Sequence, residues 1–168
     1  MKKGIIAISL MFVMGCASQK SQFIIESGVS PIWAALPITV VAPEVNITPA
    51  IFTWNQALGF EAFIEVPVCA YRCAYVIFDD TIPEYAAAVT YLVFDPITGD
   101  VKVALVKIRS TLMPWEFSRI LIHEFGHVIG LAHDPDNLNS LMFPAALPSS
   151  WFFEAEDIKQ IKERYHRE

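Results

Sequence analysis

The spacing of apolar and polar positions changes several times along the chain, and each change marks an expected element. Short stretches rich in β-branched and aromatic residues predict strands, because such side chains pack well on a pleated surface. Apolar residues three and four positions apart predict helices, because these positions share one helix face. We therefore expect strands at residues 37–42, 60–66, 74–78, 89–94 and 101–108, and helices at residues 48–58, 114–129 and 154–164.

Glycine and proline residues sharpen these boundaries. The first helix should end at Gly59, since glycine readily takes the left-handed conformation that closes helices. Pro114 suits the first turn of the second helix, where its missing N–H is not needed. The turn-rich residues 95–100 predict that the last two strands form a hairpin. A chain of 168 residues with 54% hydrophobic content can bury one core, so we expect one domain.

The N-terminal segment has the design of an export signal. Lys2 and Lys3 precede an apolar stretch at residues 5–14, and Val13-Met14-Gly15-Cys16 resembles a bacterial lipobox. The apolar stretch is too short to span a bilayer as a typical helix. We therefore expect a signal peptide at residues 1–15, a tether at residues 16–30 and the folded domain at residues 31–168.

The lipobox resemblance implies cleavage before Cys16 and lipidation of this cysteine, which would anchor an exported protein at the outer membrane or cell surface. An ordinary signal peptide, with Cys16 removed or incidental, is the alternative and would give a secreted protein. Disulfides persist outside the cytoplasm. Cys69 and Cys73 can therefore form a disulfide across their three-residue spacer, or they can remain two free or buried thiols.

Charge argues against one class of partner. The chain has 12 Lys and Arg against 18 Asp and Glu, a formal net charge of −6, and no basic patch follows from the sequence. Nucleic acid is therefore excluded as an expected partner, because phosphate binding needs clustered positive charge. The sequence contains no internal repeats. We expect the protein to be a monomer.

Residues 123–133 have the residue types and spacing of a catalytic zinc site, and they hold three of the four histidines. His123 and His127 share one helix face, so both can bind one metal ion. Gly130 can end the helix and let the reversed chain bring back His133 as a third ligand. Three neutral imidazoles leave the ion its full double charge, which lowers the pKa of a bound water to about 7, and Glu124 lies beside it as the general base. A lone histidine on an apolar helix is more often a core residue, but here five specified positions agree.

This segment resembles the signature of the metzincin metallopeptidases, H-E-x-x-H-x-x-G-x-x-H followed by a methionine turn. Met142, in Ser140-Leu141-Met142-Phe143-Pro144, resembles the methionine that forms an apolar floor beneath the zinc ligands. Pro144 stands where astacin-like and serralysin-like members have a zinc-reaching tyrosine, and the turn is closest to matrixin-like members. The resemblance implies an α+β, metzincin-like zincin fold: a five-stranded mixed twisted sheet with two long helices, an active-site helix, a Met-turn and a C-terminal helix.

The resemblance also implies how substrate and further ions would bind. A protein or peptide substrate would lie extended along the antiparallel edge strand, residues 89–94, and residues 145–153 would wall the pocket past the scissile bond. Asp157 resembles a carboxylate that braces the Met-turn, although an acid near a helix N-terminus is favourable in itself. Calcium would use loop carboxylates, but the candidates have no diagnostic spacing: Asp79, Asp80, Asp95 and Asp100.

The sequence thus predicts a zinc-dependent endopeptidase in which Glu124 is the general base. Two alternatives stay open: a non-catalytic zinc-binding or protein-interaction module on the same frame, and a hydrolase of a non-peptide amide, such as one in cell-wall material. The intact Glu124 favours hydrolysis, because a module without chemistry has no evident use for a base beside the metal.

Overall fold

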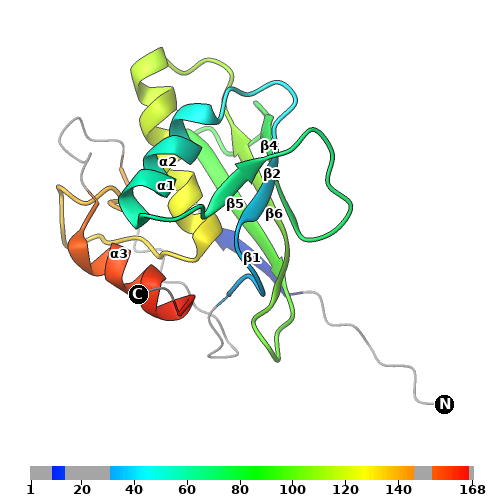
Figure 1. Cartoon of the computed structure of the whole chain (residues 1–168). Helices are drawn as coiled ribbons and strands as arrows, with labels where there is room; N and C mark the ends of the chain where they lie inside the picture. The colour runs from blue at the N-terminus through cyan, green and yellow to red at the C-terminus, as the bar shows by residue number, and fades with distance from the viewer. Residues whose placement is uncertain (1–8, 14–30, 146–152, 167–168) are drawn as a thin grey trace.

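The computed structural model describes residues 9–13, 31–145 and 153–166 (Figure 1). All eight predicted elements are present, with boundaries that differ from the expected ones by no more than a few residues. They are β2 (Ile38–Val41), α1 (Thr48–Leu58), β3 (Phe63–Glu65), β4 (Cys73–Phe78), β5 (Ala88–Phe94), β6 (Val101–Ile108), α2 (Pro114–Ile129) and α3 (Ala155–Arg164). The predicted α+β class, with a mixed sheet and three helices in the described chain, is confirmed.

The strands form one sheet in the order β1-β5-β6-β4-β2-β3, where β1 is an additional strand at Ser9–Val13. The four strands β3, β2, β4 and β6 run parallel to one another, and β5 runs antiparallel to β6. The predicted hairpin joins β5 to β6, and Gly99 in its turn has a φ of 76°. This positive φ is the reason that the turn needs a glycine.

Strand β1 was not expected, because its residues lie in the stretch that we assigned to the signal peptide. It pairs antiparallel with β5, from Ser9 opposite Phe94 to Val13 opposite Thr90. A short apolar run suits an export signal and a sheet strand equally well, so periodicity alone cannot separate them. As a result β5 is an edge strand only if β1 is left out of the sheet. Cys16 and the expected tether, residues 16–30, lie outside the described residues.

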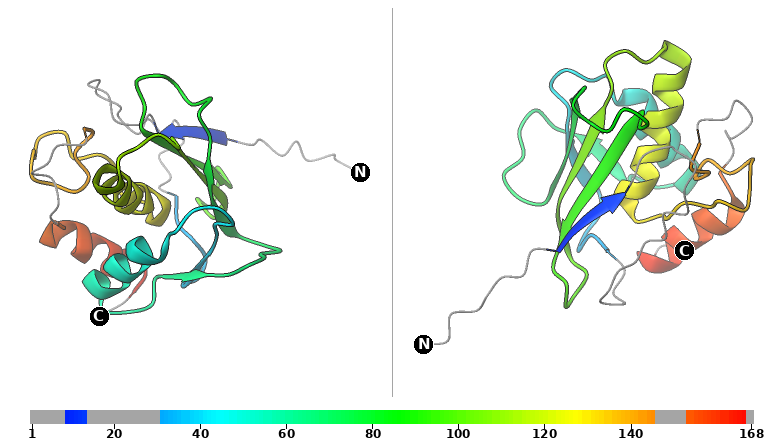
Figure 2. Two further views of the ribbon diagram at one scale, coloured as in Figure 1. Left: turned by 90° about the horizontal axis from the view of Figure 1, so that it is seen from above. Right: turned by 180° about the vertical axis from the view of Figure 1, so that it is seen from behind.

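The helices α1 and α2 lie on one face of the sheet, and α3 lies near their lower ends (Figures 1 and 2). Helix α2 packs across β5 and β6, while α1 packs against α2 and β3. Trp54 of α1 is completely buried, and its indole N–H donates to the carbonyl of Ile122 at 2.8 Å. The rings of Phe63 and Phe125 meet at 4.9 Å between centroids. The core therefore fixes α2 on the sheet through its apolar side.

The C-terminal end of α2 is held by side chains from distant parts of the chain. Gly130 ends the helix with a φ of 103°. Its last carbonyls would otherwise face only water. Three side chains donate to them: Trp33 Nε1 to Val128 at 2.7 Å, the Tyr165 hydroxyl to Ile129 at 3.3 Å, and Arg164 Nη1 to Gly130 at 2.7 Å.

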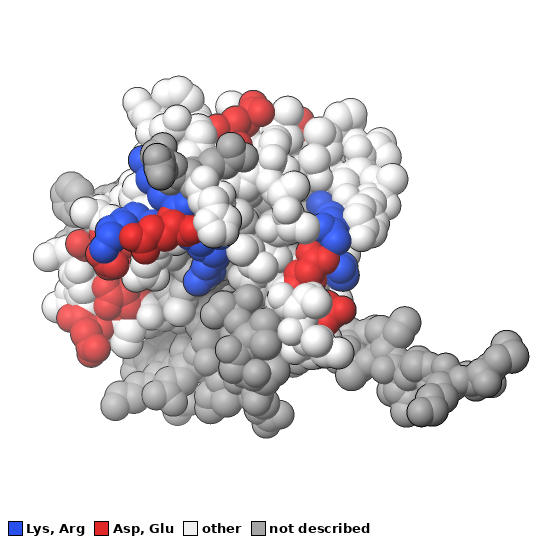
Figure 3. Space-filling view, turned by 60° about the horizontal axis from the view of Figure 1, so that its bottom comes forward, with Lys and Arg blue, Asp and Glu red and all other residues white. Residues whose placement is uncertain are grey.

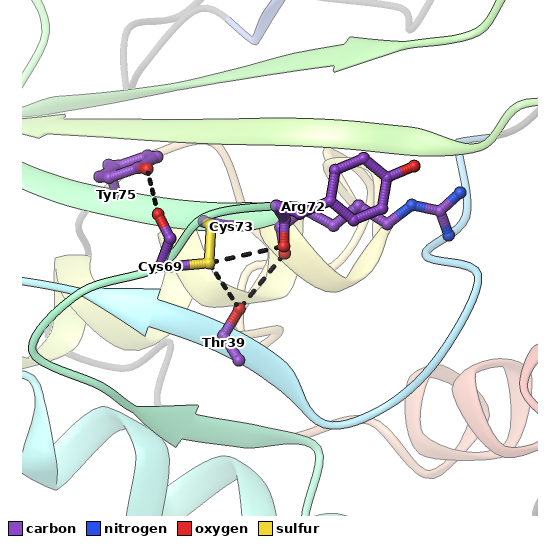
Figure 4. The surroundings of a disulfide bond; sticks show 6 residues. Thr39, Cys69, Arg72, Cys73 and Tyr75 are labelled. Carbon is purple, nitrogen blue, oxygen red and sulfur yellow. Dashed lines mark hydrogen bonds between the residues drawn. A yellow bond between two sulfur atoms is a disulfide. The ribbon is translucent and has the colours of Figure 1, made fainter.

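Cys69 and Cys73 are joined by a disulfide that closes the loop before β4, with their Cα atoms 6.1 Å apart (Figure 4). The Thr39 hydroxyl on β2 lies 3.2 Å from Cys69 Sγ and donates to the Arg72 carbonyl at 3.3 Å. The Tyr75 hydroxyl donates to the Cys69 carbonyl at 3.4 Å. The bridge and these hydrogen bonds thus tie this loop to the sheet. Within the described residues, no helix has the length and apolar character needed to cross a membrane.

Candidate metal centre

Helix α2 and the turn after it bring three imidazoles together. Nε2 of His123 lies 3.1 Å from Nε2 of His127 and 3.2 Å from Nε2 of His133, and the last two atoms are 3.1 Å apart. Tetrahedral zinc with ligands at about 2.0–2.1 Å places its nitrogens about 3.3 Å from one another. The triangle of nitrogens therefore fits one zinc ion. Within the described ranges, these histidines form the one group of three metal-binding side chains close enough to share an ion.

Backbone carbonyls select the nitrogen that each helix histidine presents. His123 Nδ1 lies 2.7 Å from the Leu141 carbonyl, and His127 Nδ1 lies 2.9 Å from the Leu131 carbonyl. A carbonyl can only accept, so the proton of each neutral ring belongs on Nδ1 and the Nε2 lone pair faces the other imidazoles. Such outer contacts are typical of metal-binding histidines. The donor set is therefore three neutral imidazoles, which suits zinc.

Burial keeps these rings neutral. It lowers the pKa of His123 to about 3 and that of His133 to about 4. It also lowers the pKa of His127 well below its usual value, and the neighbouring imidazoles add to this effect. Because a protonated imidazole cannot bind a metal, the low pKa values keep all three ligands competent at neutral pH.

Glu124 directly follows His123 in α2 and is buried, with 2% of its surface exposed. Burial raises the pKa of its carboxyl to about 7, against the lowering effect of a hydrogen bond from Thr90. Thr90 Oγ1 donates to Glu124 Oε2 at 2.5 Å, and Thr90 is itself completely buried on β5. A carboxyl with a pKa near 7 can both accept and release a proton at neutral pH, as a general base must.

Met142 lies against α2 at Gly126. In the sequence, Gly126 stands between His123 and His127. A Cβ built on Gly126 would overlap the Met142 sulfur and would lie 3.2 Å from Trp54 Cζ2. A glycine inside a helix costs about 1 kcal/mol relative to alanine. Here it provides the space that lets Met142, with 1% of its surface exposed, pack directly on the helix. Sequence reasoning selected Met142 and missed Gly126, although a glycine within an apolar helix was a visible signal.

The turn around Met142 is tied to both ligand segments. The buried Ser140 hydroxyl accepts from the Met142 N–H at 3.0 Å, which shapes the turn. The Met142 carbonyl accepts from the Asp134 N–H at 2.9 Å, directly after His133. The Leu141 carbonyl holds His123 Nδ1, as described above. Movement of this turn would therefore displace two of the three imidazoles.

Other predicted residues lie around this centre. Pro144 follows the turn and is half-buried. Of the predicted pocket wall, residues 146–152 lie outside the described residues, while the ring of Phe153 meets Trp54 edge-on at 4.7 Å between centroids. Asp157 is half-buried, and its burial, together with the charge of Asp134 and of two neighbouring glutamates, raises its pKa to about 6. The bracing role of Asp157 stays a prediction.

The four calcium candidates all have partners within the protein. Asp79 pairs with Lys107 at 2.7 Å, and Asp80 accepts from the Ser110 N–H and hydroxyl at 2.9 and 2.7 Å. Asp95 accepts from backbone N–H groups of its own turn. Asp100 pairs with Arg72 and Lys102. Figure 3 shows basic and acidic side chains next to one another in small groups on one face of the molecule. The described residues therefore give no support for a calcium site at these four positions.

Comparison with known proteins places these observations in a family context. The family model described as Matrixin, of the Peptidase_M10 peptidases, matches residues 84–166, just under half of the chain. This range includes β5, α2, the three histidines, Glu124, Met142 and α3. No curated protein matches the chain. The matched range, together with a zinc-sized histidine triangle, supports a metzincin-like family for this protein.

Proposed function

We propose that this protein is a zinc-dependent endopeptidase. The observation that carries the proposal is the convergence of three imidazoles, with the buried carboxyl of Glu124 next to His123 in the same helix. His123, His127 and His133 would hold the ion through Nε2. When bound, zinc supplies a Lewis acid that activates water and polarises the scissile carbonyl. Glu124 would accept a proton from the attacking water and deliver it to the leaving amine.

The substrate would bind as an extended chain along β5. Support comes from β1, since five residues of the chain itself pair antiparallel with this strand. Strand addition of this kind gives main-chain affinity with little sequence preference. Removal of residues 1–15 with a signal peptide would take β1 away and leave β5 open to a substrate.

Hydrolysis of casein with and without a chelator tests this function most directly. We expect activity that the chelator removes and that added zinc restores. Glu124→Ala should abolish hydrolysis and leave the zinc content near one ion per chain, because Glu124 is a base and not a ligand. An active Glu124→Ala variant would refute the mechanism.

The same assay separates the two alternatives. A non-catalytic module would bind zinc but hydrolyse neither casein nor a peptide library. A hydrolase of non-peptide amides would leave both intact and release amines from cell-wall material. Either result would overturn the endopeptidase proposal.

We also propose that the protein is exported and anchored through lipid on Cys16. After expression in a bacterium with a lipoprotein pathway, the wild type should partition into the detergent phase. Cys16→Ser should move it to the aqueous phase. Recovery of the wild type as a soluble chain that begins after Cys16 would indicate an ordinary signal peptide.

A further inference from the structure

One side chain of the sheet contacts the proposed general base. Thr90, in the middle of β5, donates from Oγ1 to Glu124 Oε2 at 2.5 Å, and at most 2% of either residue is exposed. The partners come from different elements, β5 and α2, which pack against each other. The hydrogen bond therefore fixes the carboxylate relative to the sheet as well as to its own helix.

Thr90 is well suited to fix a flexible group. A glutamate has several rotatable bonds and loses considerable freedom when it is ordered. Threonine is branched at Cβ and therefore stiff at χ1. Its backbone is held in the sheet, with Val106 of β6 opposite. A stiff donor on a paired strand can thus hold one carboxylate oxygen in place, and Oε1 is then left to receive the proton.

The backbone of the same residue lies where a bound strand would pair. Thr90 stands opposite Val13 in the β1–β5 register. Side chains alternate between the faces of a strand, so the main chain of Thr90 can belong to the substrate-binding strand while its side chain reaches α2. A single residue thus joins the strand that would align the substrate to the carboxylate that would take the proton.

We propose that Thr90 is a positioning residue, which holds Glu124 through its hydroxyl in the orientation that proton transfer requires. This inference rests on the proposed hydrolytic function. A purely structural role predicts instead that Thr90 fills space in the core, in which case a side chain of the same shape should replace it without loss of rate.

Three variants distinguish the two roles. Thr90→Val keeps the shape and removes the hydroxyl, and Thr90→Ser keeps the hydroxyl and removes a methyl group. Thr39→Val is the control, because the Thr39 hydroxyl also makes hydrogen bonds from a sheet strand, but to the loop closed by the disulfide. Each full-length protein, processed as the host processes it, is loaded with zinc and assayed with a peptide substrate.

We expect Thr90→Val to lower kcat about 10- to 100-fold, because displacement of a catalytic group by about 1 Å has effects of this size. KM and zinc affinity should stay within about two-fold of wild type, since the hydroxyl contacts neither ligand nor substrate. Thr90→Ser should recover most of kcat, and Thr39→Val should leave it unchanged.

Crystal structures of the zinc-free proteins give a readout that does not depend on activity. The Glu124 carboxylate should keep its wild-type position in Thr90→Ser and move by about 1 Å or more in Thr90→Val. Wild-type kcat with an unmoved carboxylate in Thr90→Val would overturn the proposal, and so would an equal loss in Thr90→Ser. A wild-type protein without hydrolytic activity would refute the proposed function instead, and the carboxylate positions would then decide the role of Thr90.

Discussion

Replacement of Ser140 by alanine tests how the turn around Met142 supports the metal site. The Ser140 hydroxyl is buried and accepts the Met142 N–H at 3.0 Å. Alanine removes this acceptor and leaves a buried backbone N–H without its partner. Leu141 belongs to the same turn, and its carbonyl lies 2.7 Å from His123 Nδ1. Loss of one hydroxyl should therefore affect both folding and metal binding.

The expected loss of stability follows from the burial of the Met142 N–H. An unsatisfied buried donor costs about 1–3 kcal/mol. For a domain of this length, 1 kcal/mol shifts Tm by about 2–4 °C, so Ser140→Ala should lower Tm by about 2–12 °C. Loss of outer-shell support for a metal ligand typically weakens metal binding about 10- to 100-fold. We expect zinc affinity to fall within this range, because the turn supports His123 through the Leu141 carbonyl without binding the metal itself.

Thermal unfolding of the zinc-free proteins and competition with a chromophoric chelator measure the two effects separately. Ser110→Ala is the control, since its hydroxyl donates to Asp80 on the surface. It should change stability by no more than about 0.5 kcal/mol and should not affect zinc. If Ser140→Ala matched this control in both assays, the Met142 turn would not depend on its serine and the reasoning would be refuted.

Further predictions concern Asp157, the histidines and Met142. The folded-state pKa of Asp157, about 6, lies above its ordinary 3.8, so ionisation at neutral pH destabilises the fold. Asp157→Asn should therefore stabilise the protein toward urea at pH 7.5, and the gain should vanish by about pH 4; no gain at pH 7.5 would contradict this. The pKa values of His123 and His133 are lowered to about 3 and 4 from an ordinary 6.5, so these residues make the fold less stable as pH falls. Zinc-free protein should keep its full histidine contribution above pH 6.5 and lose stability as pH falls toward 4, and His133→Ala should flatten this part of the urea-derived stability curve. Met142→Leu conserves most of the volume and should cost less than about 1.5 kcal/mol with zinc retained, whereas Met142→Ser should lower both stability and zinc content. Complete loss of zinc in Met142→Leu, measured by metal analysis, would mean that the sulfur is a ligand.

The elements were predictable because their signals are local. Gly59 and Gly130 end α1 and α2 with φ values of 77° and 103°, and each follows directly from a glycine after an apolar helical run. The histidine spacing is equally local, since His123 and His127 lie on one helix and His133 follows the turn. For these parts of the molecule, a few neighbouring residues contain the whole physical argument.

The remaining features depend on the register of distant segments. Thr90 meets Glu124 across 34 positions only because β5 faces α2 in one particular register. An isolated threonine within an apolar strand gives no sign of such a contact. Strand β1 escaped prediction for a different reason, because an apolar export signal and a sheet strand have the same composition. Gly126 marks a close approach whose partner, Met142, the sequence does not reveal.

The capping of α2 by Trp33, Arg164 and Tyr165 has a consequence for biosynthesis. A chain is made from its N-terminus, so the histidines leave the ribosome well before Arg164 and Tyr165 do. Until those two residues follow, the carbonyls of Ile129 and Gly130 can bond only to water, and the turn that brings back His133 lacks its support. The metal cage should therefore mature late, after the rest of the sheet has formed.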